Sequence, residues 1–341
     1  MNDQHSSAWA RTVVFATIML LALGGSGASA QTTPGEANSG VRTNDPQPPD
    51  PHTGNTVYFV HGYDASGGLD CAEYWGNALD EFNTNGWNGP IRTVGFYADD
   101  TNCDVTVKRD KKVSTDVRIT RIAANFANFI YEHNTKKGEP VDVVAHSMGG
   151  IITRVALLGS AKGWPGFPPD NIRVGNVVTL GTPHGGLHCD FTPDCADDQL
   201  KDQSPGSHLI EILHAPQNQL DQDWSRDTDW QFIGSDEDGI VDGDSGTYEG
   251  FYADQKHRYL RGGAEPVTHD AVHNATEGGF RVRSWDPRSD SVRVRDNAPS
   301  PLALAYRGVS RTTAPPDAWA SFVAMLNPLA QNPRIAEDPA D

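Results

Sequence analysis

The chain has 341 residues, with 27 Lys and Arg against 45 Asp and Glu and a formal net charge of −18. Its 37% hydrophobic and 21% charged residues are typical of a globular protein, and the length suffices for one large α/β domain or two smaller ones. Such an acidic chain is a poor ligand for phosphate backbones, which bind exposed Lys and Arg, so nucleic acid is excluded as a partner and anionic membranes are disfavoured.

The first thirty residues have the pattern of a secretory signal peptide. Arg11 precedes an apolar run over 13–23, and small residues follow up to an A-x-A cleavage site that ends at Ala30. As a helix this run reaches about 17 Å, too short to cross a hydrocarbon core of about 30 Å. We therefore expect residues 1–30 to be removed and the protein to be secreted into the extracellular space.

Residues 31–54 are rich in Pro, Gly, Asn and Thr, with little to bury, and they are predicted to form a disordered leader. From Thr56 on, short continuous runs of β-branched and apolar residues recur, of the kind that is buried on both faces of a parallel sheet. Such strands are predicted at 57–60, 91–97, 141–145, 174–180, 230–233 and 258–260.

Helical patterns separate several of these strands. The clearest is 116–133, where apolar residues recur at three- and four-residue spacing. Strands that alternate with helices indicate parallel βαβ units, hence an α/β fold with a mostly parallel, doubly wound sheet and helices on both faces. We assign this main domain to residues 55–279.

The C-terminal region has a different pattern. Two strand-like pieces, FRVRS and SVRVRD, alternate within 280–311, and a short helix is predicted at 317–326. We interpret 280–341 as an Arg-rich extension packed on the main domain, whose arginines pair with the acidic body rather than with a ligand.

Four cysteines in an exported chain suggest disulfides. Because Cys189 and Cys195 are close in sequence, they can close a local loop, and Cys71 would then pair with Cys103. Three connectivities are possible, and proximity in sequence is the only argument for this one. No CxxC pair or zinc-finger histidine spacing indicates a metal site.

Ser147 lies in the segment VDVVAHSMGG, directly after a predicted buried strand and before a predicted helix. The pattern Ala145-x-Ser147-x-Gly149 is that of a nucleophile elbow with Ala in the first small position. This turn is so sharp that the residues two before and two after the serine must be small, and the helix that follows directs backbone N–H groups at developing negative charge.

A serine nucleophile requires a base and an orienting acid, here expected in that chain order after later strands. Asp236, Glu237 and Asp238 follow the predicted strand 230–233, and we select Asp238 because Gly239 allows a tight turn and Ile240-Val241 can anchor the loop. For Asp236 and Glu237, solvation or cation binding is the favoured interpretation.

Two histidines compete for the role of base. His269 is selected because it comes first after the last predicted strand of the main domain, while His273 is expected on a helix face one turn later. His257 is set aside because it is expected before that strand, at the wrong end. The remaining histidines are interpreted as structural or exposed: 52, 61, 133, 146, 184, 188, 208 and 214.

An oxyanion hole needs two backbone donors. One is expected to be the N–H of Met148, which follows the nucleophile. The other is expected in the turn after the first strand, where Gly62 permits close approach of the backbone; Tyr63 is selected and Asp64 is the second choice.

The motifs FVHGY, VVAHSMGG, TLGTPHGG and GSDEDGIV, followed by VTH, resemble those of secreted bacterial lipases and esterases of the α/β-hydrolase fold, most of all small lipases with an A-H-S-M-G elbow. The resemblance covers roughly 56–274. It implies a Ser147–Asp238–His269 triad, an oxyanion hole from Tyr63 and Met148, and an acyl pocket bordered by the TLGTPHGG loop (179–186). The chain differs from the small lipases in a long insert after this loop.

That insert, 187–229, is rich in acidic residues and contains an amphipathic piece at 208–213. It can be interpreted as a lid whose apolar face opens at a lipid surface, or as a surface excursion with one helix docked on the core; both interpretations remain open. Acidic clusters here and at 236–244 offer the oxygen ligands of Ca²⁺. No EF-hand spacing is present, so solvated charge is favoured and no cofactor or metal is predicted.

The sequence thus predicts a secreted serine carboxylic-ester hydrolase, a triacylglycerol lipase or carboxylesterase, that acts on a small-molecule or lipid ester through an acyl-enzyme on Ser147. A transient contact with a lipid interface would suit this activity, and no protein partner is implied. The alternatives are an acyltransferase that uses the same triad and a non-catalytic binding protein of the same fold. A peptidase is less favoured, since no motif suggests a site for peptide termini.

Overall fold

The structure, a computed structural model, describes residues 54–107, 113–188, 197–248, 250–263, 265–286 and 291–310. The predicted signal peptide, nearly all of the leader, the Cys189–Cys195 pair and the helix at 317–326 lie outside these residues. All the described residues belong to one compact unit, residues 48–341. Within them, no helix has both the length and the apolar character needed to cross a membrane.

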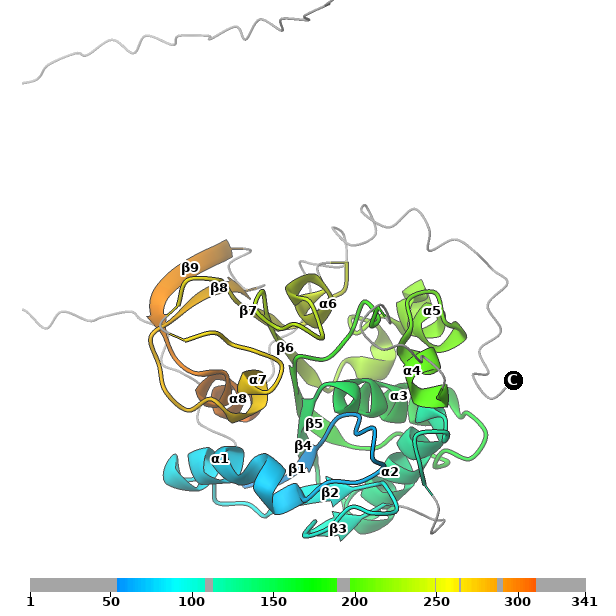
Figure 1. Cartoon of the computed structure of the whole chain (residues 1–341). Helices are drawn as coiled ribbons and strands as arrows, with labels where there is room; N and C mark the ends of the chain where they lie inside the picture. Colours follow the sequence, from blue (N-terminus) through cyan, green and yellow to red (C-terminus); the bar gives the residue numbers. More distant parts are fainter. Residues whose placement is uncertain are drawn as a thin grey trace, which may run out of the picture. The chain divides into compact units, whose positions relative to one another are not determined.

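A nine-stranded sheet forms the centre of the described part of the chain, in the order β3-β2-β1-β4-β5-β6-β7-β8-β9 (Figure 1). The first seven strands are parallel, and the last two are antiparallel. The strands are β1 (Thr56–Val60), β2 (Ile91–Gly95), β3 (Val105–Thr106), β4 (Val141–His146), β5 (Val174–Leu180), β6 (Asp229–Ser235), β7 (Gln255–Tyr259), β8 (Phe280–Asp286) and β9 (Ser291–Ala298).

The central strands are apolar on both sides because helices cover both faces of the sheet. Along β1, Tyr58 and Val60 pack into one core cluster, whereas Val57 and Phe59 pack into the other. This alternation is the two-residue period of a strand. The predicted doubly wound parallel sheet is confirmed.

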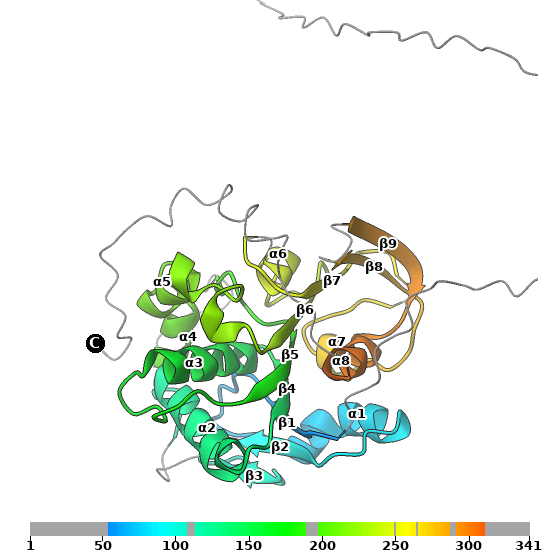
Figure 2. The same cartoon turned by 180° about the vertical axis from the view of Figure 1, so that it is seen from behind.

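One face of the sheet is covered by α2 (Ile119–His133) and α3 (Met148–Lys162), and the other by α1 (Cys71–Thr84), α7 (Ala271–Asn274) and α8 (Pro301–Val309) (Figures 1 and 2). The predicted helix at 116–133 is thus present, and it begins three residues later than expected. The connections between the parallel strands bring their carboxyl ends to one edge of the sheet, where ligand sites of α/β folds form.

The insert contains two helices, α4 (Asp198–Gln203) and α5 (His208–His214). The apolar side of α5 is buried in the same core cluster as α2 and α3, and its buried residues are Leu209, Ile210, Ile212 and Leu213. In this structure the amphipathic piece is therefore a helix docked on the core.

Helix α4 is held by buried polar contacts as well. Gln199 donates from Nε2 to the carbonyl oxygens of Ser114 and Val117, at 3.0 and 3.1 Å. The Asp202 carboxylate accepts from the N–H of Ile119 at 2.9 Å, at the start of α2. These contacts attach the described part of the insert to the segment that precedes α2.

Within the predicted extension, residues 280–286 and 291–298 continue the central sheet as two strands. β8 pairs with β7, and β9 is the edge strand. Sequence alternation predicts strands but not the sheet they join. In β9 the six residues 292–297 are all exposed, so both faces of this edge strand meet solvent. Arg281 forms an ion pair with Asp296 at 3.5 Å across this hairpin, so at least one of its arginines pairs locally rather than with the acidic body.

Helix α8 was not predicted, although its start carries a clear signal. Ser300 caps the helix by accepting from the N–H of Ala303, and Pro301 occupies the first helical position. Its apolar face packs on the sheet, where Leu302 and Ala305 are fully buried. The helix thus completes the face that α1 covers.

The predicted Cys71–Cys103 disulfide is present, with Cα atoms 4.9 Å apart. Cys71 is the first residue of α1, and Cys103 precedes β3. The bond therefore ties the start of α1 to the end of the loop that follows β2.

Candidate active site

Ser147 occupies the sharp turn between β4 and α3, where the nucleophile elbow is predicted. Its backbone has φ 54° and ψ −130°, a conformation that residues with side chains rarely adopt. A Cβ atom added at Gly149 would lie 2.3 Å from the carbonyl oxygen of Val60, so this position accepts only glycine. The close approach of β1 explains why the elbow pattern requires a small residue there.

The three residues selected for a triad lie together at the carboxyl edge of the sheet. Ser147 follows β4, Asp238 follows β6, and His269 follows β7. The Nε2 atom of His269 lies 3.1 Å from the Ser147 Oγ, and its Nδ1 atom lies 2.8 Å from Asp238 Oδ2. Residues separated by 122 and 31 positions in the sequence are thereby joined in one hydrogen-bonded chain.

The Asp238 side chain is completely buried. Its second oxygen, Oδ1, accepts from the N–H groups of Ile240 and Val241, each at 2.8 Å. Both carboxylate oxygens are thus hydrogen bonded, one to the imidazole and one to the turn that follows. Such contacts compensate for the burial of a charge and fix the orientation of the carboxylate.

The competing acids have other partners. Asp236 accepts from Nε of Arg258 at 2.5 Å, and Asp244 is hydrogen bonded to the same guanidinium. Glu237 accepts weakly from the N–H of Val267 at 3.4 Å. A fixed positive charge already lies between Asp236 and Asp244, and no group of three metal-ligating side chains occurs in the part of the chain that the structure describes. Two acids of this cluster are therefore paired with arginine, although the Asp244 side chain is still 81% exposed to solvent.

The competing histidines lie away from Ser147 Oγ. His273 is on α7, as expected, but its ring is buried and stacks on Tyr74 with the ring centroids 4.3 Å apart. Burial lowers the pKa of His273 to about 4. His257 was expected before the last strand of the main domain; it lies within β7 instead, with Nδ1 2.7 Å from the Ser284 hydroxyl.

The loop after β1 packs directly on the nucleophile. A Cβ atom at Gly62 would lie only 2.7 Å from the Cβ of Ser147, so glycine is needed for this approach. The N–H of Asp64 lies 3.5 Å from the Tyr97 hydroxyl. Neither Tyr63 nor Met148, the first residue of α3, donates its N–H to another group among the described residues. This difference favours Tyr63 over Asp64 as a donor to a ligand.

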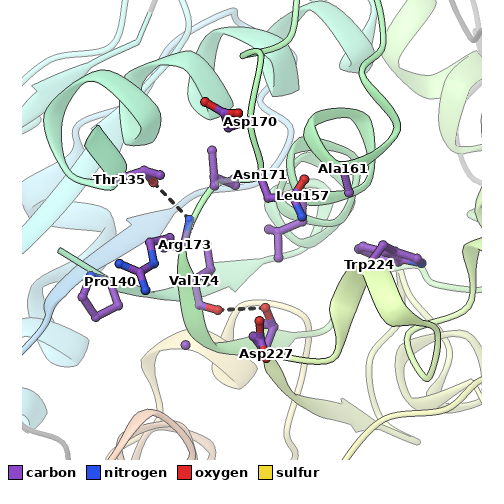
Figure 3. A pocket seen from close by; sticks show the side chains of 13 residues that line it. Thr135, Pro140, Leu157, Ala161, Asp170, Asn171, Arg173, Val174, Trp224 and Asp227 are labelled. Carbon is purple, nitrogen blue, oxygen red and sulfur yellow. Dashed lines mark hydrogen bonds between the residues drawn. The ribbon is translucent and has the colours of Figure 1, made fainter. Parts of the chain in front are cut away.

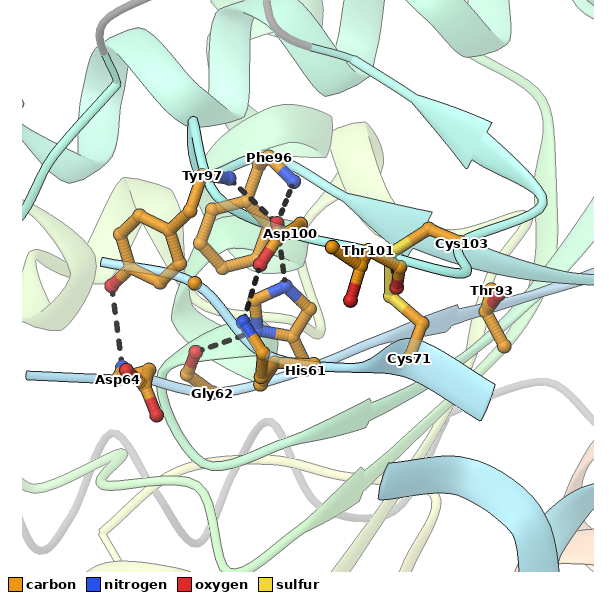
Figure 4. A network of polar contacts seen from close by, with 12 residues as sticks. His61, Gly62, Asp64, Cys71, Thr93, Phe96, Tyr97, Asp100, Thr101 and Cys103 are labelled. Atoms are coloured by element: carbon orange, nitrogen blue, oxygen red, sulfur yellow. Dashed lines mark hydrogen bonds and ion pairs between the residues drawn. A yellow bond between two sulfur atoms is a disulfide. The ribbon is translucent and has the colours of Figure 1, made fainter. Parts of the chain in front are cut away.

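A buried polar network stabilises the loop after β1 (Figure 4). The Nε2 atom of His61 lies 3.2 Å from Asp100 Oδ2, which also accepts from the N–H groups of Phe96 and Tyr97, each at 2.7 Å. Burial opposes ionisation of Asp100, but the hydrogen bonds from His61 and the backbone outweigh it and hold its pKa below the ordinary value. His61 directly precedes Gly62, so the network fixes the backbone that faces Ser147.

The TLGTPHGG loop (179–186) lies beside the elbow. The hydroxyl of Thr182 donates to the carbonyl oxygen of Ser147 at 2.9 Å. His184 is buried, and its ring stacks on Phe232 with centroids 3.7 Å apart. This loop therefore supports the turn that carries Ser147.

A cavity of about 670 Å³ lies at the opposite edge of the sheet (Figure 3). Its lining residues include Pro140, Arg173 and Trp224, which come shortly before β4, β5 and β6 in the chain. Since Ser147 follows the carboxyl end of β4, the length of the strand, about 20 Å, separates this cavity from the triad.

Comparison with known proteins agrees with the fold. Residues 51–197 match the family model described as a PGAP1-like alpha/beta domain. A GPI inositol-deacylase of Debaryomyces hansenii is 26% identical over 121 residues, 36% of this chain and only 11% of the length of that curated relative.

Similar solved structures include a mature lipase of Bacillus licheniformis, 18% identical, covering 57% of this chain and 70% of that one, with a TM-score of 0.36. Lipase B of Aspergillus fumigatus is 16% identical, with coverages of 80% and 61% and a TM-score of 0.42. The phospholipase PlaB of Legionella pneumophila is 15% identical, with coverages of 56% and 44% and a TM-score of 0.38.

The order and direction of the strands, together with the PGAP1-like match, identify the fold as that of an α/β-hydrolase.

Proposed function

We propose that this protein is a serine carboxylic-ester hydrolase whose nucleophile is Ser147, with His269 as the base and Asp238 as the orienting acid. The hydrogen-bonded chain from Ser147 Oγ through His269 to the buried Asp238 carboxylate is the observation that carries this proposal. An imidazole so placed can take a hydroxyl proton, and the carboxylate selects its tautomer and stabilises the imidazolium that forms.

The proposed reaction has two halves. Ser147 Oγ attacks the ester carbonyl carbon while His269 Nε2 takes the hydroxyl proton, and the N–H groups of Tyr63 and Met148 stabilise the oxyanion. His269 then gives this proton to the leaving alcohol, and the acyl-enzyme remains. A water molecule, deprotonated by His269, attacks the acyl carbon, and the acid leaves as Ser147 recovers its proton.

The substrate class proposed here is a small-molecule or lipid ester, with a transient contact at a lipid interface where the ester is insoluble. The curated relative is named a deacylase, and removal of an acyl group from a hydroxyl is ester chemistry that the same triad would perform. The matched region is a small part of that relative, so its particular substrate is not transferred to this chain.

Hydrolysis of p-nitrophenyl esters from acetate to palmitate tests the proposal. Wild type should release nitrophenol, and Ser147→Ala should lower kcat by at least about 10⁴-fold while its melting temperature stays near that of wild type. Ser310→Ala, at the end of α8, is the matched control and should keep full activity. Retained activity in Ser147→Ala would refute the assignment of the nucleophile.

An added alcohol acceptor separates hydrolase from acyltransferase. The proposed hydrolase should give mainly free acid, whereas an acyltransferase would give mainly the new ester. No turnover together with no labelling by a serine-reactive phosphonate would instead favour a non-catalytic binding protein.

We further propose that the protein is secreted after removal of residues 1–30. The apolar run at 13–23 and the Cys71–Cys103 disulfide support this location, because disulfides persist in oxidising compartments. Mass spectrometry of protein recovered from the culture medium should give an N-terminus near Gln31. Recovery of the full-length chain only inside cells would contradict the proposal.

A further inference from the structure

The residue before the nucleophile makes a contact that the triad does not account for. His146 ends β4, and its side chain is buried beneath the loop that carries His269. Its Nε2 atom lies 2.9 Å from the backbone carbonyl oxygen of His269, and its Nδ1 atom is hydrogen bonded to the Tyr74 hydroxyl. Both ring nitrogens are thus engaged in a fully enclosed site.

These partners determine the tautomer of His146. A carbonyl oxygen can only accept, so Nε2 must carry the proton. Burial, reinforced by His273 and His269 nearby, lowers the pKa of His146 well below its ordinary value, so the ring stays neutral and Nδ1 is an acceptor. Burial also raises the pKa of Tyr74, whose hydroxyl keeps its proton and donates it to Nδ1. The order is Tyr74 O–H to Nδ1, then Nε2–H to the His269 carbonyl.

The hydrogen bond from His146 to the His269 carbonyl oxygen lies next to the triad. The His269 ring is held at its nitrogens by Ser147 and Asp238, and His146 holds the backbone of the same residue. His146 is also bonded covalently to Ser147. One rigid side chain therefore connects the backbone of the nucleophile to the backbone of the base.

We propose that His146 is a positioning residue: as a neutral Nε2–H imidazole, oriented by Tyr74, it sets the distance between His269 Nε2 and Ser147 Oγ. This inference rests on the proposed function of the triad, but the tautomer it requires does not. A base displaced by about 1 Å lowers turnover by about 10²-fold, so loss of this contact should reduce kcat more than KM.

Three variants separate positioning from packing. His146→Phe keeps an aromatic ring and removes both nitrogens, and His146→Gln keeps a side-chain N–H at a similar reach. Tyr74→Phe removes only the hydroxyl that orients His146. His257→Phe is the matched control, since His257 is another buried strand histidine whose Nδ1 contacts Ser284 rather than the triad.

In each variant, kcat per phosphonate-titrated serine should be measured beside KM and the melting temperature. His146→Phe should lower kcat by about 10- to 100-fold with KM within about twofold of wild type. The kcat of His146→Gln should be at least about threefold higher than that of His146→Phe. Tyr74→Phe should lower kcat less than His146→Phe does. His257→Phe should keep kcat. A kcat for folded His146→Phe within about twofold of wild type, or equal losses in His257→Phe, would overturn the positioning role.

Nitrogen-15 spectra of the histidine side chains give a readout independent of activity. His146 should show a protonated Nε2 and an unprotonated Nδ1 from about pH 5 to 8, and Tyr74→Phe should perturb Nδ1. An Nδ1–H tautomer or a doubly protonated ring would refute the inference even in an active enzyme. An inactive wild type with the expected tautomer would refute the proposed function and leave the hydrogen bonding of His146 correct. If His146→Phe does not fold, the kcat of Tyr74→Phe and the tautomer seen in these spectra test the positioning role instead.

Discussion

Asp238 Oδ2 lies 2.8 Å from Nδ1 of His269, and the other oxygen of this carboxylate is held by two backbone N–H groups of its own loop. The carboxylate is thus fixed before substrate arrives, and it can orient the imidazole at no cost in reorganisation.

Asp238→Asn should therefore reduce kcat strongly while the protein stays folded. The amide offers an N–H where His269 needs an acceptor, so the wrong tautomer is favoured, and the expected loss in kcat is about 10³- to 10⁴-fold. Asp236→Asn is the matched control, because Asp236 belongs to the same loop but pairs with Arg258. Equal losses of ester hydrolysis in the two variants would contradict the role given to Asp238.

Gly62→Ala tests the close approach of the loop after β1 to Ser147. The added Cβ would lie 2.7 Å from the Ser147 Cβ, so the loop must move, with an expected loss of stability of about 1–3 kcal/mol and a lower kcat. Gly76→Ala in α1 is the control: no atom outside the adjacent helix backbone lies within 4 Å of its new Cβ, and a helical alanine should stabilise by about 0.5–1 kcal/mol. Urea unfolding and ester hydrolysis measure both effects. A Gly62→Ala variant with wild-type stability and turnover would show that the loop does not pack on Ser147 in this way.

The parts of the fold that could be predicted from the sequence are those with a local signal. Continuous apolar runs located β1, β4 and β5, and the small residues around Ser147 located the elbow because β1 leaves no space for a side chain at Gly149. The order in which candidate residues follow the strands narrowed the acid to 236–238 and favoured His269 as the base, since parallel strands end at one edge. The tight turn expected at Gly239 then selected Asp238.

Other features depend on contacts between distant segments and have no local signal. His61 and Asp100 are 39 residues apart, and Tyr74 and His146 are 72 apart, so no pattern in the sequence indicates that either pair is in contact. His257 was placed before its strand because strand ends are poorly defined by composition. The alternating pattern of β8 and β9 indicated strands but not the edge they extend.

Removal of the disulfide should lower stability substantially. The bond joins residues 32 positions apart, and in the chain-entropy model a loop of this length stabilises the folded state by about 4 kcal/mol. The double variant Cys71→Ala/Cys103→Ala should unfold at a lower urea concentration, and reduction of wild type should give a similar loss. If neither treatment changes the midpoint, the bond does not form in the protein.

Chelation of divalent cations should leave both activity and melting temperature unchanged. Arg258 already provides a positive charge to Asp236 and Asp244, two of the acids in the 236–244 cluster for which Ca²⁺ was considered. Ester hydrolysis and thermal unfolding with EDTA, and then with excess Ca²⁺, measure this. A rise in melting temperature with Ca²⁺ would show that a site exists elsewhere in the chain.

Stability should decrease between about pH 7.5 and 5, because buried histidines resist protonation. Burial lowers the pKa values of His214 and His273 to about 4. An unfolded histidine is half protonated at about pH 6.5, so between about pH 7.5 and 4 the unfolded state binds protons that the folded state does not. The free energy of unfolding therefore falls as the pH falls, by about 2 kcal/mol per histidine at pH 5.

His273→Phe isolates one of these contributions. The variant keeps an aromatic ring against Tyr74 and removes the titrating group, so its loss of unfolding free energy between about pH 7.5 and 5 should be smaller than that of wild type by about 2 kcal/mol. Asp100 does not interfere, because a carboxyl whose pKa is lowered loses its contribution only below the ordinary value of about 3.9. Urea unfolding at the two pH values decides: an equal loss in variant and wild type would mean that His273 accepts a proton as readily in the folded protein as in the unfolded chain.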